Sequence, residues 1–237
     1  MGHMNVLVVV AHPDDEALGF GATGARLADV GARVRCCFLS GEVTARRQRP
    51  ADEDLVGDTL RAQELFGFDH PTFGPFPNIK MNTVPHLDLV HFVEQAMLEF
   101  QADTLVTHHP HDINDDHRQV ASAVMAAARL HQRRGDSVPA LAQLLHMEIL
   151  SSTDWQFASD NNPFNPDTYV EMGPDYLARK IRGLEAYRGV SRPYPHPRSR
   201  EAIVAQAVLR GAESGLDRAE AFVTGFRRWQ PELHRGP

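Results

Sequence analysis

Residues 5–40 read NVLVVVAHPDDEALGFGATGARLADVGARVRCCFLS, and the fold class can be inferred from them. Asn5 to Ala11 is a run of mostly β-branched apolar residues ended by polar ones, which is typical of a fully buried parallel strand. Ala17 to Val30 has apolar residues at helical spacing and stops at Gly31, and Arg33 to Leu39 forms a second strand-like run. These residues therefore predict a strand–helix–strand unit with parallel strands.

The alternation of strand and helix continues beyond this unit. Further helices are expected over residues 55–66, 84–100 and 117–131, and strands over residues 72–76 and 104–107. Val90, Val93 and Met97 repeat at helical spacing, so we expect them to face the core. The alternation predicts an α/β fold, a Rossmann-like three-layer sandwich whose mostly parallel sheet is covered by helices on both faces.

The pattern is less regular beyond Gly135. A strand is expected over residues 141–151, helices over residues 176–187 and 201–211, and an ordered Pro-rich loop over residues 192–197. The sequence contains no internal repeat or obvious linker, so we expect a single domain over residues 4–237 with an irregular C-terminal region of helices and loops. Residues 1–3 look like a cloning remnant ahead of Met4.

Composition and charge narrow the class of protein. The 237 residues are 42% hydrophobic and 23% charged, as in soluble globular proteins. A net charge of -7 disfavours nucleic acid as a partner, because affinity for phosphates rests on Lys and Arg. The longest apolar run, Val6 to Ala11, is too short to span a bilayer, so we expect a cytoplasmic protein without an integral membrane segment. The two cysteines, Cys36 and Cys37, point to opposite faces of a strand, so we expect reduced thiols.

Two polar clusters follow the predicted strands directly. Residues 11–16, AHPDDE, come after the first strand, and residues 108–117, HHPHDINDDH, come after the strand at 104–107. In an open sheet of order 3-2-1-4-5, strands one and four are neighbours where the chain reverses direction, and ligands bind in that crevice. The two clusters are therefore expected to face each other.

The residue types in these clusters predict a catalytic metal site. His12, Asp15 and His117 supply two imidazoles and a carboxylate, which is a sufficient protein ligand set for zinc, although another divalent metal could replace it. Zinc activates water and polarises a carbonyl, which suits attack on an amide. Asp14 lies beside a ligand on a turn, so we expect it to act as general base and then as proton donor to the leaving amine.

These motifs resemble those of the PIG-L-like, or LmbE-like, zinc deacetylase family. Its first motif reads A-H-P-D-D-E, which residues 11–16 match completely, and its later motif ends in D-H, which Asp116 and His117 match. Residues 180–187 and 219–222 resemble the family's C-terminal helices. The resemblance implies a zinc-dependent enzyme that removes an N-acyl group, expected to be acetyl, from an amino sugar or sugar conjugate. The oligomeric state is open, a homo-oligomer included.

The sequence departs from this family at one position. Many relatives have an oxyanion-stabilising histidine three residues before the last zinc ligand, where this chain has Asn114. Asn can donate a hydrogen bond to developing negative charge but cannot carry a positive charge. We expect either Asn114 or His196 to take this role. His196 is favoured because it lies in a loop fixed by prolines, and Arg198 of the same loop is expected to bind substrate.

The remaining polar residues have weaker assignments. Asp116 is expected to cap the following helix, to hold a histidine ligand in its tautomer, or both. Asp112 and Arg46 are expected to contact substrate, and Arg46 has a solvated loop as its alternative. Three histidines, His108, His109 and His111, are expected to be loop residues that contact substrate or solvent.

Two other functions fit parts of the sequence. Residues 19–24 spell the G-x-G-x-x-G of dinucleotide-binding proteins, but that fingerprint must form the turn after the first strand, which residues 12–16 occupy here. We expect these glycines to let helix and sheet approach closely instead. The second alternative is a catalytically silent sugar-binding or metal-binding protein on the deacetylase scaffold, against which the retained Asp14 argues.

Overall fold

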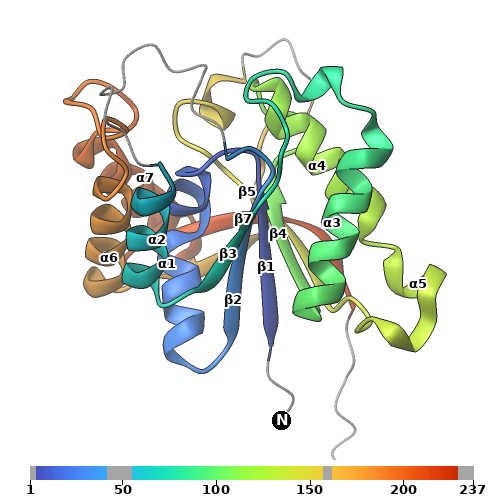
Figure 1. Ribbon diagram of the computed structural model, residues 1–237. Coiled ribbons are helices and arrows are strands. Elements are labelled where there is room, and N and C mark those ends of the chain that lie inside the picture. Colours follow the sequence, from blue (N-terminus) through green and yellow to red (C-terminus); the bar gives the residue numbers. More distant parts are fainter. Residues whose placement is uncertain (1–3, 42–54, 157–161, 229–237) are drawn as a thin grey trace, which may run out of the picture.

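The computed structural model describes residues 4–41, 55–156 and 162–228 and contains one mixed sheet of seven strands (Figure 1). Its strands are β1 (Asn5–Val10), β2 (Arg33–Phe38), β3 (Asp69–Phe73), β4 (Thr104–His108), β5 (Gln143–Met147), β6 (Thr168–Glu171) and β7 (Ala219–Arg227). They are ordered β3-β2-β1-β4-β5-β7-β6 across the sheet. The first five pair in parallel, as expected, and β7 and β6 pair antiparallel.

Helices cover both faces of this sheet. They are α1 (Asp15–Asp29), α2 (Leu55–Phe66), α3 (His86–Phe100), α4 (Asp115–Ala127), α5 (Leu130–Arg134), α6 (Pro174–Glu185) and α7 (Arg200–Ser214). Figure 1 shows α1, α2, α6 and α7 on one face and α3, α4 and α5 on the other. The predicted Rossmann-like three-layer sandwich is therefore confirmed.

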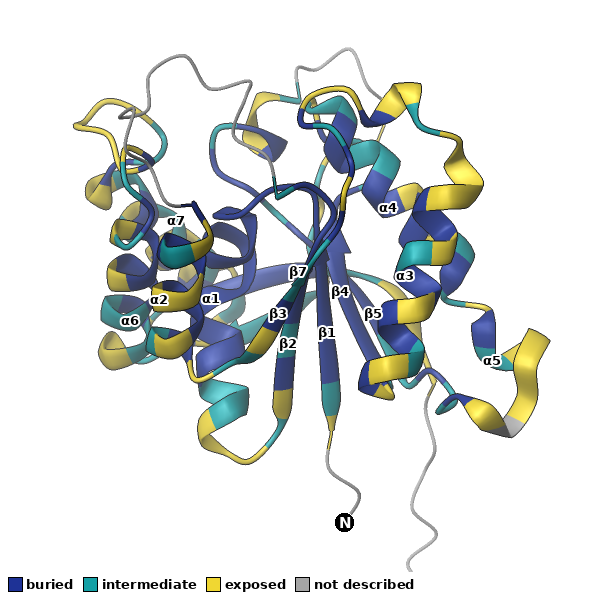
Figure 2. Cartoon of the chain, viewed as in Figure 1, coloured by how far each residue is buried: buried dark blue, intermediate teal, exposed yellow. Residues whose placement is uncertain are grey.

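The central strands are buried from both sides, and Figure 2 shows the same burial on the inner sides of the helices. The side chains of β1 alternate between two hydrophobic clusters, with Val8 in one and Leu7 in the other. Cys36 and Cys37 divide in the same way, and both thiols are buried and free. The expected core residues of α3, Val90, Val93 and Met97, are buried as well.

The C-terminal part of the sheet corrects one expectation. Residues 219–222 were expected to be helical but form the start of β7, which pairs with both β5 and β6. Alanine in this stretch favours a helix in isolation. Phe222, however, is fully buried and packs edge-to-face on Phe20, with ring centroids 5.9 Å apart. Tertiary packing thus overrides the helix propensity of residues 219–222. The neighbouring strand β6 was not expected from the sequence.

The glycine motif lies inside α1 and does not form the turn after β1. A Cβ placed on Gly19 would be 2.5 Å from the sulfur of Met147, and one on Gly24 would be 2.4 Å from the ring of Phe68. The glycines therefore allow close helix packing, as expected, and do not cradle a dinucleotide. Within the described residues, we find no helix both long enough and apolar enough to cross a membrane.

Candidate metal centre

The AHPDDE motif folds into a tight turn between β1 and α1. The N–H of Asp15 donates to the carbonyl of His12 over 3.3 Å, and the N–H of His12 donates to the Asp15 carboxylate over 2.9 Å. Asp14, between them, has a φ of 110°, outside the regions that residues other than glycine usually adopt. Strained backbone of this kind persists where the surroundings hold it, often at active sites. The turn brings two potential ligands together.

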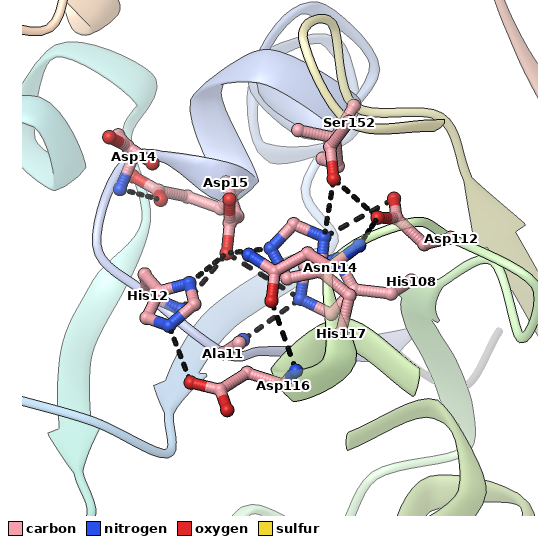
Figure 3. A network of polar contacts seen from close by, with 12 residues as sticks. Ala11, His12, Asp14, Asp15, His108, Asp112, Asn114, Asp116, His117 and Ser152 are labelled. Carbon is pink, nitrogen blue, oxygen red and sulfur yellow. Dashed lines mark hydrogen bonds and ion pairs between the residues drawn. The ribbon is translucent and has the colours of Figure 1, made fainter. Parts of the chain in front are cut away.

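The expected metal ligands meet at the carboxyl ends of β1 and β4 (Figure 3). One oxygen of Asp15, Oδ2, lies 3.4 Å from Nδ1 of His12 and 3.4 Å from Nε2 of His117. All three donor atoms lie within 4.8 Å of one another, and all three residues are buried. A tetrahedral zinc ion with bonds of about 2.1 Å separates its ligand atoms by roughly 3.4 Å. The donor set therefore fits zinc in its chemistry and in the distance of each histidine nitrogen from Asp15.

The second ring nitrogen of each histidine contacts a carboxylate. Nε2 of His12 lies 2.9 Å from Asp116, and Nδ1 of His117 lies 3.2 Å from Asp112. Carboxylates in this position fix the tautomer and the ring orientation of a metal-binding histidine. Asp116 thus makes the expected contact with the outer ring nitrogen of a potential histidine ligand, His12. Asp112 makes the same kind of contact with His117.

Charge interactions dominate the protonation of this cluster. Burial opposes charge on His117, but Asp15 and Asp112 outweigh it and raise the pKa of His117 to about 10. Burial likewise opposes charge on Asp15, but His117 and His12 hold the pKa of its carboxyl well below the usual range. The pKa of Asp112 falls to about 2 beside His117, against the effect of burial. The pocket is therefore built to hold a cation next to its carboxylates.

Asn114, not Asp116, caps α4. Its side-chain oxygen accepts a hydrogen bond from the N–H of Asp116 over 3.0 Å. The Asp116 carboxylate faces the other way and also accepts N–H groups from Ile79 over 2.6 Å and from Met81 over 3.0 Å. The capping role considered for Asp116 is therefore wrong, and its contact with His12 remains.

Asp112 has a different environment from the expected one. It is 1% exposed, and its carboxylate accepts hydrogen bonds from the hydroxyls of Ser152 and Thr153. These partners and His117 surround it, so the geometry offers no support for substrate contact. Sequence reasoning did not find Ser152 or Thr153, which follow β5 and reach the site only through sheet order.

His108 belongs to the sheet instead of an exposed loop. It ends β4, is fully buried, and stacks on His117 with ring centroids 3.9 Å apart and an interplanar angle of 10°. Its Nε2 accepts the N–H of Ala11 over 2.9 Å, which places its own proton on Nδ1. Burial lowers the pKa of His108 to about 3. The expected contact with substrate or solvent is wrong for this residue, which supports the turn and the ligand ring.

Asp14 is held from two sides. It is fully buried, and its Oδ2 lies 3.2 Å from Nη1 of Arg198, whose Nε donates to Ser151 over 2.8 Å. The N–H of Asp14 donates to Glu16 over 3.1 Å. The hydroxyl of Tyr187 donates to the same buried carboxyl group, Glu16, over 2.5 Å. The C-terminal region thus fixes the residue expected to be the general base.

Glu16 itself has an unusual pKa. Burial raises the pKa of this carboxyl to about 8, despite hydrogen bonds from Tyr187 and from the backbone of Asp14. Sequence reasoning assigned Glu16 no role. Its contact with Tyr187 could not be predicted, because the two residues lie far apart in the sequence.

The ligand set opens into a cleft of about 480 Å³. Its lining consists of His12, Asp15, Asn78, Ile79, Ile113, Asn114, Asp115, His117, Ser151, Ser152 and Arg198. Asn114, a candidate for stabilising the oxyanion, and Arg198, expected to bind substrate, both belong to this lining. His196 is exposed and does not belong to this lining, and its Nδ1 accepts the N–H of Arg198 over 3.0 Å. Arg46 lies outside the described residues.

The turn and the three potential metal ligands lie within a part of the chain that matches a known family. Residues 7–128, just over half of the chain, match the family described as PIG-L, GlcNAc-PI de-N-acetylase. The chain belongs to the PIG-L family. The predicted resemblance is thereby confirmed. No protein of curated function matches the chain significantly in sequence.

Several solved structures share the fold of this PIG-L family member. The conserved protein TT1542 from Thermus thermophilus has a TM-score of 0.77 and 22% identity, covering 98% of this chain and 100% of its own. The N,N'-diacetylchitobiose deacetylase from Pyrococcus horikoshii has a TM-score of 0.73 and 16% identity, covering 92% and 82%. GalB, the 4-carboxy-2-hydroxymuconate hydratase from Pseudomonas putida, has a TM-score of 0.69 and 17% identity, covering 97% and 100%. At these identities the likenesses establish the fold alone.

Proposed function

We propose that this PIG-L family member is a zinc-dependent hydrolase that removes an N-acyl group, with acetyl as the expected group, from an amino sugar or sugar conjugate. One observation carries the proposal. The buried donor atoms of His12 and His117 each lie 3.4 Å from Oδ2 of Asp15, the separation expected for neighbouring ligands of a tetrahedral zinc ion, and the three residues line a cleft of about 480 Å³. The family match and the fold shared with a diacetylchitobiose deacetylase support the choice of substrate class.

His12, Asp15 and His117 would hold the metal. A zinc ion bound there would activate a water molecule and polarise the acyl carbonyl. The other steps belong to side chains of this chain. Asp14 takes a proton from the attacking water as the oxygen adds to the acyl carbon, and it passes that proton to the nitrogen when the C–N bond breaks. The products are the carboxylic acid and the free amine.

Negative charge develops on the acyl oxygen during this addition. The side-chain nitrogen of Asn114 is a hydrogen-bond donor in the cleft lining and can stabilise that charge, while its oxygen caps α4. Arg198 is the cation among the described lining residues and holds Asp14 through Nη1. We assign Arg198 to substrate binding and to positioning of the base, in preference to His196. Arg46 stays a predicted substrate contact.

Asp112 and Asp116 serve the reaction indirectly in this proposal. Each contacts the ring nitrogen of His117 or His12 that faces away from Asp15. Metal binding requires neutral imidazoles, and a carboxylate behind each ring keeps its proton on the outer nitrogen. These two residues therefore orient the ligands without touching substrate.

The test is acetate release by metal-stripped protein reconstituted with zinc. A panel of free and conjugated N-acetyl amino sugars is incubated with the wild-type protein and with His117→Ala. We expect acetate from at least one conjugate with zinc-loaded wild type and none from the variant or the chelated protein. Reconstitution with iron, manganese and cobalt in parallel identifies which metal supports the highest turnover.

Two outcomes would contradict the proposal. Zinc-loaded protein that releases no acid from any acyl amide would support a catalytically silent binding protein. Addition of water to 4-carboxy-2-hydroxymuconate under the same conditions would support a hydratase, the activity for which GalB, a protein of this fold, is named.

A further inference from the structure

Within the described part of the chain, the cleft lining contains two apolar residues, Ile79 and Ile113, among otherwise polar or charged ones. Both are well exposed, Ile79 at 57% and Ile113 at 44%. Single exposed isoleucines are common on protein surfaces and need no explanation. Here, however, two of them approach one cleft from different loops, one after β3 and the other after β4.

The backbone of Ile79 gives a second, independent reason to expect a role. Its φ is 58°, in the left-handed region that a β-branched residue rarely adopts. The surroundings impose this conformation, because the N–H of Ile79 donates to Asp116 over 2.6 Å and the N–H of Met81 donates to the same carboxylate. Asn or Gly would adopt this backbone with less strain. An isoleucine that is both strained and exposed contributes little to the core, so its side chain is expected to serve a ligand.

The backbone around Ile113 is also fixed. Its carbonyl accepts a hydrogen bond from Arg118 over 2.9 Å, and its neighbours Asp112 and Asn114 are held behind His117 and at the start of α4. The side chain is therefore presented to the cleft by a backbone that is anchored on both sides. Two fixed apolar groups at the edge of a polar cleft are a preformed contact for an apolar substituent.

We propose that the cleft recognises amino sugars that carry an apolar substituent, an alkyl or aryl aglycone, and that Ile79 and Ile113 bind this substituent. A free sugar offers hydroxyl groups to the polar lining but leaves both isoleucines in water. An alkyl chain covers them and removes their surface from water, which is favourable in proportion to the area covered. Covering about half of each exposed side chain corresponds to roughly fivefold in affinity per isoleucine.

The KM measurement rests on the proposed deacetylase function, because it requires removal of the acyl group. The contact between the apolar substituent and the two isoleucines does not depend on that function. The experiment compares free N-acetylglucosamine with its octyl β-glycoside, used below its micelle concentration, on the zinc-loaded protein. We expect KM to be about 10–30-fold lower for the octyl glycoside. Ile79→Asn and Ile113→Asn should each reduce this preference, measured as the ratio of the two KM values, roughly fivefold.

The variants are chosen to separate contact from folding. Ile79→Asn keeps the N–H that binds Asp116 and tolerates the left-handed backbone, so the metal ligands are undisturbed. Ile79→Leu keeps the apolar side chain and should keep the preference. Leu209→Gln removes an apolar residue that is 55% exposed on α7, outside the cleft lining, and should also leave the preference unchanged.

Binding is measured separately by calorimetry, with the two sugars titrated into zinc-loaded Asp14→Asn. Tighter binding of the octyl glycoside that falls roughly fivefold when Ile79→Asn is added to Asp14→Asn supports the inference, even if no acetate is released by wild type. Equal affinity for the two sugars overturns it, even if wild type deacetylates both. A preference for the octyl glycoside that both asparagine variants retain overturns it as well.

Discussion

Asp116→Asn should weaken zinc binding without unfolding the protein. The wild-type carboxylate accepts three hydrogen bonds, from Nε2 of His12, from the N–H of Ile79 and from the N–H of Met81, over 2.9, 2.6 and 3.0 Å. An asparagine offers only one oxygen at this position. The side-chain NH₂ group of the asparagine cannot accept a hydrogen bond. At least one of the three donors would therefore lose its acceptor.

The magnitude follows from that count. Leaving a buried donor without its acceptor costs about 1–3 kcal/mol. If the contact that is lost is the one that orients the His12 ring, zinc affinity falls by roughly 10–100-fold. The pKa of Asp116 is lowered by His12 and by the N–H groups of Met81 and Ile79, against burial, so the wild-type group is ionised when it orients the ring.

The assay is competition for zinc between the protein and a chromophoric chelator, with circular dichroism as the check on folding. Asp88→Asn is the matched control, because it removes the same charge from the first turn of α3, where Asp88 is exposed. A folded Asp116→Asn protein with the zinc affinity of Asp88→Asn would rule out the orienting role, since Asp116 would then only fix the loop that contains Ile79.

Three further predictions test other parts of the site and the fold. Asp14→Asn should bind zinc as tightly as wild type but lose about 10²–10⁴-fold in kcat, and a near-normal kcat would remove Asp14 from proton transfer. Because the metal-free pKa of His117 is about 10, the ring is protonated at neutral pH, and zinc must displace that proton. Zinc affinity should therefore rise about tenfold per pH unit between roughly pH 6 and 8 for each proton displaced, and calorimetry in buffers of different ionisation enthalpy should show proton release, whereas an absence of release would contradict the assignment. Lys180→Met should cost about 3–5 kcal/mol in denaturant unfolding, because it leaves Glu220 charged and buried after loss of a 2.7 Å ion pair, and addition of Glu220→Gln should recover part of that cost.

The sequence predicts the N-terminal part of the fold, where the local pattern of apolar residues determines the strands and helices. Val6–Val10 is an unbroken apolar run, and the described part of α2 ends at Phe66, as its spacing predicts. The candidate ligands His12, Asp15 and His117 could be predicted to lie close together, because they belong to two polar segments that follow β1 and β4, neighbouring strands whose places in the sheet were predictable.

Long-range contacts explain what the sequence did not reveal. Ser152 and Thr153 support Asp112 only because β5 lies beside β4, and local spacing does not place their hydroxyls at the site. Arg198 and His196 are two residues apart in a loop rich in prolines, so sequence alone could not decide which of them reaches Asp14. Residues 219–222 have an alanine content that favours a helix, and pairing with β5 and β6 decides otherwise.

Anomalous diffraction at the zinc edge, recorded from crystals of zinc-reconstituted protein, would locate the metal on which the proposed hydrolysis depends. One strong peak is predicted, within about 2.0–2.2 Å of Nδ1 of His12, Oδ2 of Asp15 and Nε2 of His117. A fully loaded crystal with its zinc peak elsewhere, and none between these three atoms, would contradict the metal site and the hydrolase built on it.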